Sequence, residues 1–152
     1  MKKTFLFLLT FLVVGASSIQ AQDKKAIKKL IKTSSKALKK YKADTSNATK
    51  LEEAQQAIEK AMAMEGAAKM PETWNAKAAI FQFIGQNELS IRQKKEVEAQ
   101  LAAGGDPGTM APIQYTFESP EAPKLAFESL SKAFELTEKK SSKSKIIKEL
   151  EI

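Results

Sequence analysis

The sequence predicts an all-α protein built from antiparallel helix pairs. Apolar residues recur at spacings of three and four in four separate segments, which is the period of a helix with one buried face. Prolines and glycines stand near the starts and ends of these segments, where they favour helix boundaries. No segment alternates apolar and polar residues as a half-buried strand does. We therefore expect helices alone to build the core.

The first 21 residues have the layout of a secretory signal peptide. Two lysines precede an apolar run over residues 5–14, and small residues then lead to Ala21. The apolar run is shorter than the roughly 20 residues that span a bilayer. We expect cleavage near Ala21–Gln22 and export to the periplasm or the cell exterior, with residues 22–152 forming one helical domain. An uncleaved N-terminal anchor is the alternative.

The first expected helix of this domain covers residues 24–42 and is strongly basic. Its apolar face consists of Ile27, Leu30, Ile31, Ser34, Leu38 and Tyr41, and nine lysines surround that face. The simpler interpretation is a helix that packs its apolar face inward and keeps its lysines in water. The alternative is a basic amphipathic helix that contacts an anionic partner or a membrane surface. The lysines assigned to that contact are Lys28, Lys32, Lys36 and Lys39.

The next two helices follow after a polar connection. Thr49 and Glu52 have the spacing of a capping box, and the second helix is expected to run from there to about Gly66. Pro71 suits the first turn of a third helix. The inner face of the third helix is expected to carry Trp74, Ala78 and Phe81.

Residues 87–119 are expected to form an insertion that is partly irregular. Their apolar stripe is thin, and the glycines and proline of residues 104–108 break any helix. Two prolines then open a helix that includes residues 125–136. A further helix is expected at the C-terminus, where four apolar residues recur after residue 145.

Two of these helices share a spacing of small and large residues. In the second helix the small residues Ala54 and Ala61 flank Ile58, and in the fourth Ala126 and Ala133 flank Leu130. Small residues allow a neighbouring helix backbone to approach closely, and the large residue fills the space beside them. Each of these helices follows another amphipathic helix. The pattern therefore predicts a repeated helix pair.

On these residues the sequence resembles the tetratricopeptide repeat (TPR) family. The second helix of that repeat carries the small-large-small pattern, and its first helix carries W-x2-L-G-x2-Y, which Trp74, Ala78 and Phe81 match while Lys77 departs from it. The chain is similar to secreted repeat proteins of Bacteroidota type. The resemblance implies a TPR-like α-solenoid of about two units, with residues 87–119 inserted between the two helices of the second unit.

The composition narrows the chemistry. The chain has neither cysteine nor histidine, which excludes a Cys/His zinc site and a histidine general base. The GGDPG segment lacks the Gly-Lys-Ser/Thr of a phosphate loop and predicts a turn. A serine–lysine pair such as Ser35 and Lys39 is a catalytic alternative, but we expect no enzymatic activity, no cofactor and no metal.

The resemblance implies a non-enzymatic scaffold that binds a protein or peptide segment in a groove between helices. The lysines of residues 24–42 favour an acidic partner. The alternative is a basic envelope protein that binds anionic lipid or polysaccharide through this helix, so membrane-surface contact is a secondary expectation. Despite the formal charge of +7, we expect no nucleic-acid partner, because the chain is expected to be exported.

Overall fold

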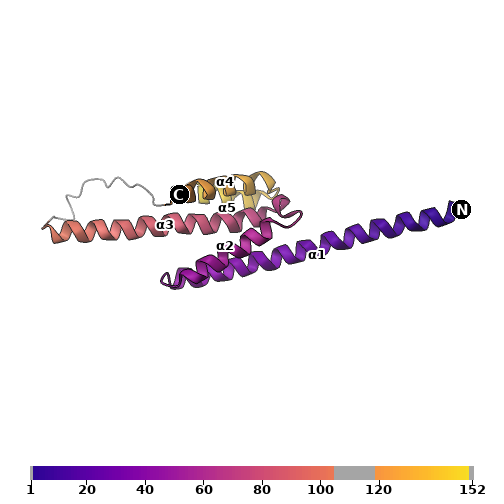
Figure 1. Ribbon diagram of the computed structural model, residues 1–152. Coiled ribbons are helices and arrows are strands. Elements are labelled where there is room, and N and C mark those ends of the chain that lie inside the picture. The colour runs from indigo at the N-terminus through magenta and orange to yellow at the C-terminus, as the bar shows by residue number, and fades with distance from the viewer. Residues whose placement is uncertain (1, 105–118, 151–152) are drawn as a thin grey trace.

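A computed structural model describes residues 2–104 and 119–150, with side chains from residue 23 onward. These ranges contain five α-helices and one short 3-10 helix, and the α-helices are labelled in Figure 1. They are α1 (Lys2–Ala43), α2 (Ala48–Met62), η1 (Ala67–Lys69), α3 (Pro71–Ala102), α4 (Glu121–Leu136) and α5 (Lys140–Leu150). Within the described ranges there is no strand, so the prediction of an all-α fold is confirmed.

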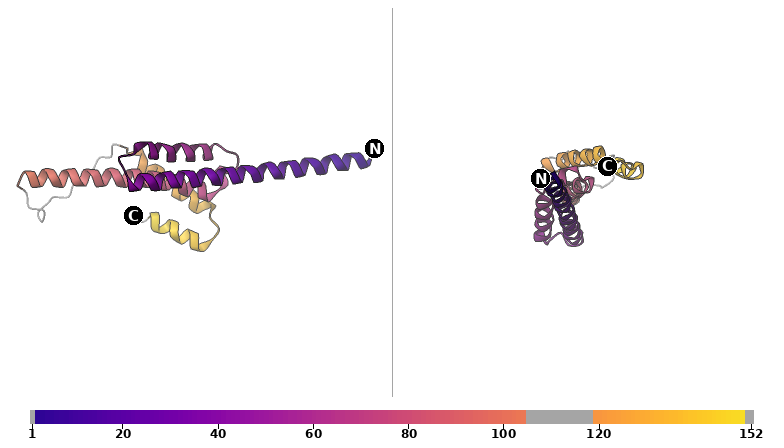
Figure 2. Two further views of the ribbon diagram at one scale, coloured as in Figure 1. Left: turned by 90° about the horizontal axis from the view of Figure 1, so that it is seen from below. Right: turned by 90° about the vertical axis from the view of Figure 1, so that its right-hand side faces the viewer.

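The helices pack as two antiparallel pairs. The main contacts join α1 to α2 and α3 to α4, while α3 also contacts both helices of the first pair. Figures 1 and 2 show that the chain reverses direction within each pair and that α5 runs back along α4. The helix-pair expectation therefore holds for the described residues.

Most helix boundaries follow the sequence signals, with one correction. Pro71 is in the first turn of α3, and Gly66 has φ +81° in the turn after α2, a backbone conformation that favours glycine. The capping box of Thr49 and Glu52 does not form. The helix α2 begins one residue earlier, at Ala48, and Asn47 precedes it without a side-chain capping bond. Thr49 therefore lies inside the first turn.

The first pair encloses one hydrophobic core. Its buried residues include Ile27 and Leu38 of α1 and Ile58 of α2. At the crossing, Ser34 is fully buried and its hydroxyl donates a hydrogen bond of 2.9 Å to the carbonyl oxygen of Ala54. A larger residue at either position would separate the helices, because interiors are close-packed.

The second pair encloses a smaller core with α5. Ala78 of α3 meets Leu130 and Ala133 of α4, and Ile146 of α5 completes the cluster. The side chain of Trp74 packs against it, and its ring N–H donates a hydrogen bond of 3.0 Å to the carbonyl oxygen of Ala68. Both the ring of Trp74 and its N–H group therefore make contacts within the fold.

The helix α3 belongs to both cores. Ile80 is fully buried in the first core, and Ala78, two residues earlier, is fully buried in the second. Further along, Gly85 is buried beside Pro123 of α4, and a Cβ atom built on Gly85 would lie 3.7 Å from the Pro123 Cγ. The contact brings the backbone of α3 close to the first turn of α4.

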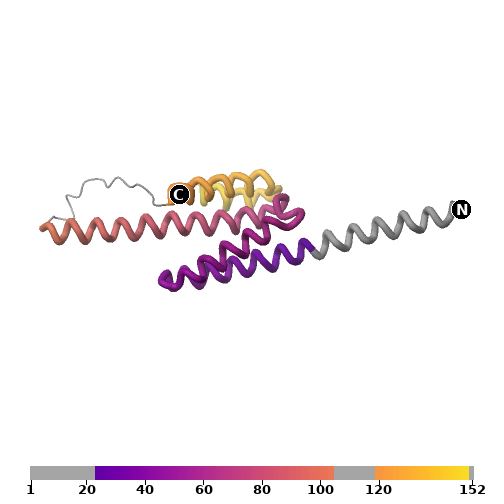
Figure 3. The backbone as a smooth tube through the Cα atoms, in the orientation of Figure 1, coloured from indigo at the N-terminus to yellow at the C-terminus, as the bar shows by residue number. Residues whose placement is uncertain are grey.

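Residues 87–102, the first part of the expected insertion, continue α3 without a break. The helix has 32 residues, which corresponds to roughly 48 Å. The reason is local: these residues are mostly strong helix formers, and no glycine or proline occurs between Gly85 and Gly104. Figures 2 and 3 show this end of α3 extending beyond α2 and α4. The rest of the expected insertion, residues 105–118, lies outside the described residues.

The prediction of a signal peptide concerns residues whose side chains lie outside the described ones, and it stays a prediction. Among the residues that the structure describes, no helix has an apolar stretch that is long enough to cross a membrane.

The close approach of α3 and α4 can be tested at Ala133, which is fully buried. We expect Ala133→Leu to lower the free energy of unfolding by about 1–3 kcal/mol, since the added atoms have no space between the helices. Ala99→Leu is the matched control, because Ala99 is exposed on α3, and it should change the value by less than about 0.5 kcal/mol. Urea denaturation followed by circular dichroism measures both. Equal stability of the two variants would contradict the packing described for α3 and α4.

Candidate functional site

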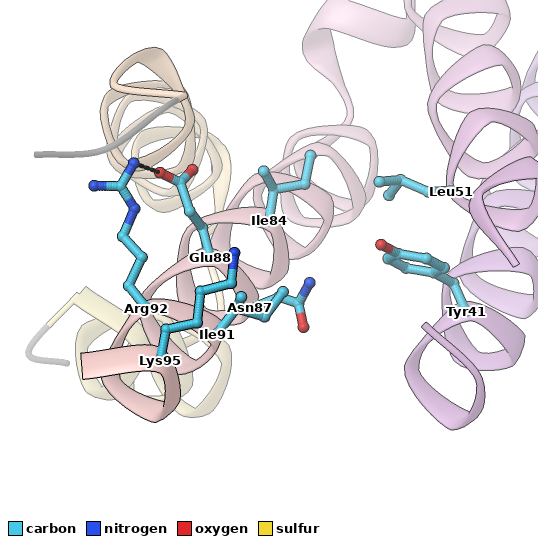
Figure 4. Close-up of a pocket in the computed structure, with 8 residues that line it drawn as sticks. All are labelled: Tyr41, Leu51, Ile84, Asn87, Glu88, Ile91, Arg92 and Lys95. Carbon is cyan, nitrogen blue, oxygen red and sulfur yellow. Dashed lines mark ion pairs between the residues drawn. The ribbon is translucent and has the colours of Figure 1, made fainter. Parts of the chain in front are cut away.

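A pocket opens where the first helix pair meets α3. It has a volume of about 250 Å³ and is shown in Figure 4. The residues that line it are Tyr41, Leu51, Ile84, Asn87, Glu88, Ile91, Arg92 and Lys95. Three helices contribute: Tyr41 comes from the end of α1, Leu51 from the start of α2, and the other residues from α3.

The contribution of α3 is one continuous helix face. Ile84, Glu88, Ile91 and Lys95 follow one another at spacings of four, three and four, so they lie above one another along the helix. Asn87 and Arg92 flank this row. The face exists only because α3 continues past residue 86 as a helix.

The apolar part of the pocket lies between the first pair and α3. Figure 4 shows the side chains of Leu51 and Tyr41 pointing across the pocket toward α3. Tyr41 is buried, and its ring meets the ring of Phe83 edge to face at a centroid distance of 5.6 Å. This contact fixes the orientation of Tyr41. On the opposite side the side chain of Ile91 is 46% exposed, so one apolar side chain faces solvent beside the pocket.

Glu88 and Arg92 form the polar wall of the pocket. A guanidinium nitrogen of Arg92 lies 3.5 Å from a carboxylate oxygen of Glu88, as the dashed line in Figure 4 marks. The other oxygen of Glu88 accepts a hydrogen bond of 3.1 Å from the backbone N–H of Ser119. Since Ser119 stands just before α4, Glu88 ties α3 to the start of that helix.

The remaining polar groups of the pocket are Asn87 and Lys95. Asn87 is half-buried and Lys95 is exposed. An amide can both donate and accept hydrogen bonds, and an ammonium group attracts a carboxylate. Nearby, the ammonium of Lys42 lies 5.0 Å from the centre of the Phe83 ring. The mouth thus combines an apolar surface with amide and cationic groups, an arrangement suited to binding.

Most of the packing residues predicted from the sequence lie in the two cores or pack against them. Ala54, Ile58 and Ala61 are buried in the first. Ala78, Leu130 and Ala133 form the second, and Ala126 is buried on the same helix as Leu130. Trp74 is partly buried and packs against the second core. Phe81 is also partly buried but belongs to neither core, so the expectation of an inward-facing Phe81 is not borne out as it is for the others.

The predicted cationic residues lie elsewhere. Lys28, Lys32, Lys36 and Lys39 are exposed on α1, and none of them lines the pocket. Ser35, the serine of the alternative catalytic pair, is also exposed on α1. In the described part of the chain no three acidic side chains gather closely enough to hold a metal ion.

Sequence reasoning missed the pocket itself. Five of its residues, from Asn87 to Lys95, fall in the segment interpreted as an insertion. The signal that was available is the continued spacing of Ile84, Ile91 and Lys95 through a stretch without glycine or proline. That spacing predicts a longer third helix with one side facing the first pair.

Comparisons with protein families, with curated proteins and with solved structures find no match to this chain.

The role of Glu88 in joining α3 to α4 can be tested by Glu88→Ala. We expect it to lower the free energy of unfolding by about 1–2 kcal/mol, because the variant loses both an ion pair and a hydrogen bond of a carboxylate that is only 13% exposed. Hydrogen exchange should also become faster at the N–H of Ser119.

The matched control is Glu98→Ala. Glu98 faces Lys94 on the same helix, but both side chains are more than half exposed, so the expected change is below about 0.5 kcal/mol. If both variants lose the same stability, or if exchange at Ser119 is unaltered, Glu88 does not hold the two helices together.

Proposed function

We propose that this chain is a non-enzymatic interaction scaffold that binds a segment of another protein or peptide in the pocket between α1, α2 and α3. The observation that carries the proposal is the composition of the pocket mouth. Ile91 presents an exposed apolar surface there, with Asn87 and Lys95 beside it. Binding surfaces of this kind combine an apolar centre with a polar rim.

The size of the pocket favours a segment of a larger partner. Its volume of about 250 Å³ is below the roughly 300–1,000 Å³ that is usual for sites of complete small molecules. One or two side chains of a polypeptide would fill it.

The charges around the pocket favour an acidic segment. Lys95 and Arg92 line the pocket, and Lys42 follows the lining residue Tyr41 in the chain. Glu88 is the one acidic residue among those that line the pocket, and its carboxylate faces Arg92. A partner with an aliphatic side chain next to an aspartate or glutamate would place the first against Ile91 and the second near Lys95. Complementary charge of this kind mainly raises the rate and the specificity of association.

A TPR-like arrangement is part of the proposal. Two features support it: in the first pair the small Ser34 meets Ala54, and in the second pair the small Ala78 meets Ala133. In this interpretation α1 and α2 form one unit, α3 and α4 form the second, and α5 takes the position of a following first helix. The proposed setting is the cell envelope, which depends on the predicted signal peptide.

Selection of peptides from a random displayed library tests this function. We expect selected peptides to carry an aliphatic residue close to an acidic one. Ile91→Ser should weaken their binding about tenfold, since the aliphatic contact is lost. Lys95→Glu should weaken the acidic peptides most, and the loss should shrink at high salt.

Leu101→Ser is the matched control for Ile91→Ser. Leu101 is 49% exposed on the same helix but does not line the pocket, so its variant should bind the selected peptides as the original chain does. The proposal fails if the library yields no binder, or if Ile91→Ser and Leu101→Ser behave alike.

A further inference from the structure

One side of α1 is a continuous surface of lysines. We call the set Lys25, Lys28, Lys32, Lys36 and Lys39 the lysine face; its members follow one another at spacings of three and four. This places them on one side of the helix, over roughly 21 Å of its length. All five are exposed, and they lie opposite the buried residues that face α2 and α3.

The positive charge of the protein is concentrated in this helix. The formal net charge is +7, while residues 24–43 contain nine lysines and no acidic residue. All other residues together therefore carry a net charge of −2. Positive charge is therefore distributed very unevenly over the molecule. A nearby anionic surface would attract the protein with α1 facing that surface.

Lysines on the other helices differ from those of the lysine face in having acidic neighbours. In α2, α3 and α4, several lysines lie within 4 Å of a glutamate three or four positions away, as in the pairs Lys50–Glu53, Lys94–Glu98 and Lys132–Glu135. No acidic residue stands three or four positions from any member of the lysine face. Like charges at this spacing destabilise a helix. Repulsion among the lysines of the lysine face thus destabilises α1, and an anionic partner bound to this face would reduce that repulsion.

The shape and chemistry of the face fit a flat layer of anions. All of its cations are lysines, whose ammonium groups act as point charges without the planar geometry with which arginine grips a single phosphate. The large apolar side chains that are exposed in the described residues lie on α3, α4 and α5, and the apolar side of α1 is occupied by the core. The face can therefore rest on a surface but has no apolar group with which to enter it.

We propose that the lysine face docks the protein on the surface of a bilayer rich in anionic phospholipid, by electrostatic contact and without insertion. Tyr41 lies on the opposite side of α1, where it lines the pocket described above. Docking on lipid and binding of a segment in the pocket would therefore use separate surfaces. The proposal does not depend on what the pocket binds.

Vesicle sedimentation with the full-length chain tests the proposal. Vesicles of phosphatidylcholine alone are compared with vesicles that also contain phosphatidylglycerol, so that any apolar contribution from the first residues cancels. We expect strong preference for the anionic vesicles at low salt and loss of that preference at high salt.

The key variant is the triple substitution Lys32→Gln, Lys36→Gln and Lys39→Gln. Lys28 is left unchanged, because it shares a second pocket with Glu65 and Glu72. The matched control changes three exposed lysines away from α1, namely Lys60→Gln, Lys139→Gln and Lys145→Gln, and removes the same total charge. At about fivefold per lysine near the surface, the face variant should lose roughly 100-fold in binding to anionic vesicles. The control should lose less than about tenfold.

The proposal is overturned if both triple variants lose the same affinity, since net charge alone would then explain it. Equal binding to neutral and anionic vesicles also overturns it. A soluble acidic polysaccharide is tested in parallel: if the chain binds it but ignores anionic vesicles, the partner of the lysine face is a glycan and the lipid proposal is wrong. Circular dichroism of each variant verifies that helix content is unchanged, as expected for exposed positions.

Discussion

The buried contact between Ser34 and the carbonyl of Ala54 sets the spacing of the first helix pair. A hydroxyl group of this size satisfies its hydrogen bond only when the two backbones are close. The position of Leu51, near the start of α2, is then fixed relative to Tyr41 near the end of α1. One wall of the pocket is therefore a consequence of a packing contact that lies about two turns from Tyr41 along α1 and about one turn from Leu51 along α2.

In the second pair, the small side chains of alanines allow α3 and α4 to approach closely. The helix α3 also connects the two cores. Ala78 and Ile80 are two residues apart and are buried in different clusters, so α3 cannot shift against one pair without disturbing the other. This shared helix also carries the other wall of the pocket. The two halves of α3 differ: the first half contributes Ala78 and Ile80 to the two cores, and the second half contributes Asn87, Ile91 and Lys95 to the lining of the pocket.

Sequence reasoning was most successful where a local pattern has one physical meaning. The spacing of Ala126, Leu130 and Ala133 requires a close helix neighbour, and these residues are buried as expected. It did not foresee that residues 87–102 extend the third helix itself, because an expected repeat length assigned them to an insertion between two helices. The pocket could not be predicted at all, because Tyr41, Leu51 and Ile84 come from three helices and only the packing brings them together.

The uninterrupted course of α3 divides the helix into a supported part and an unsupported part. Ala78 and Ile80 hold the first part in both cores, whereas the far end extends beyond α2 and α4. A helix without packing against a neighbour is marginal in water. The last turns of α3 are therefore held mainly by their own backbone hydrogen bonds and should open before the turns around Ala78.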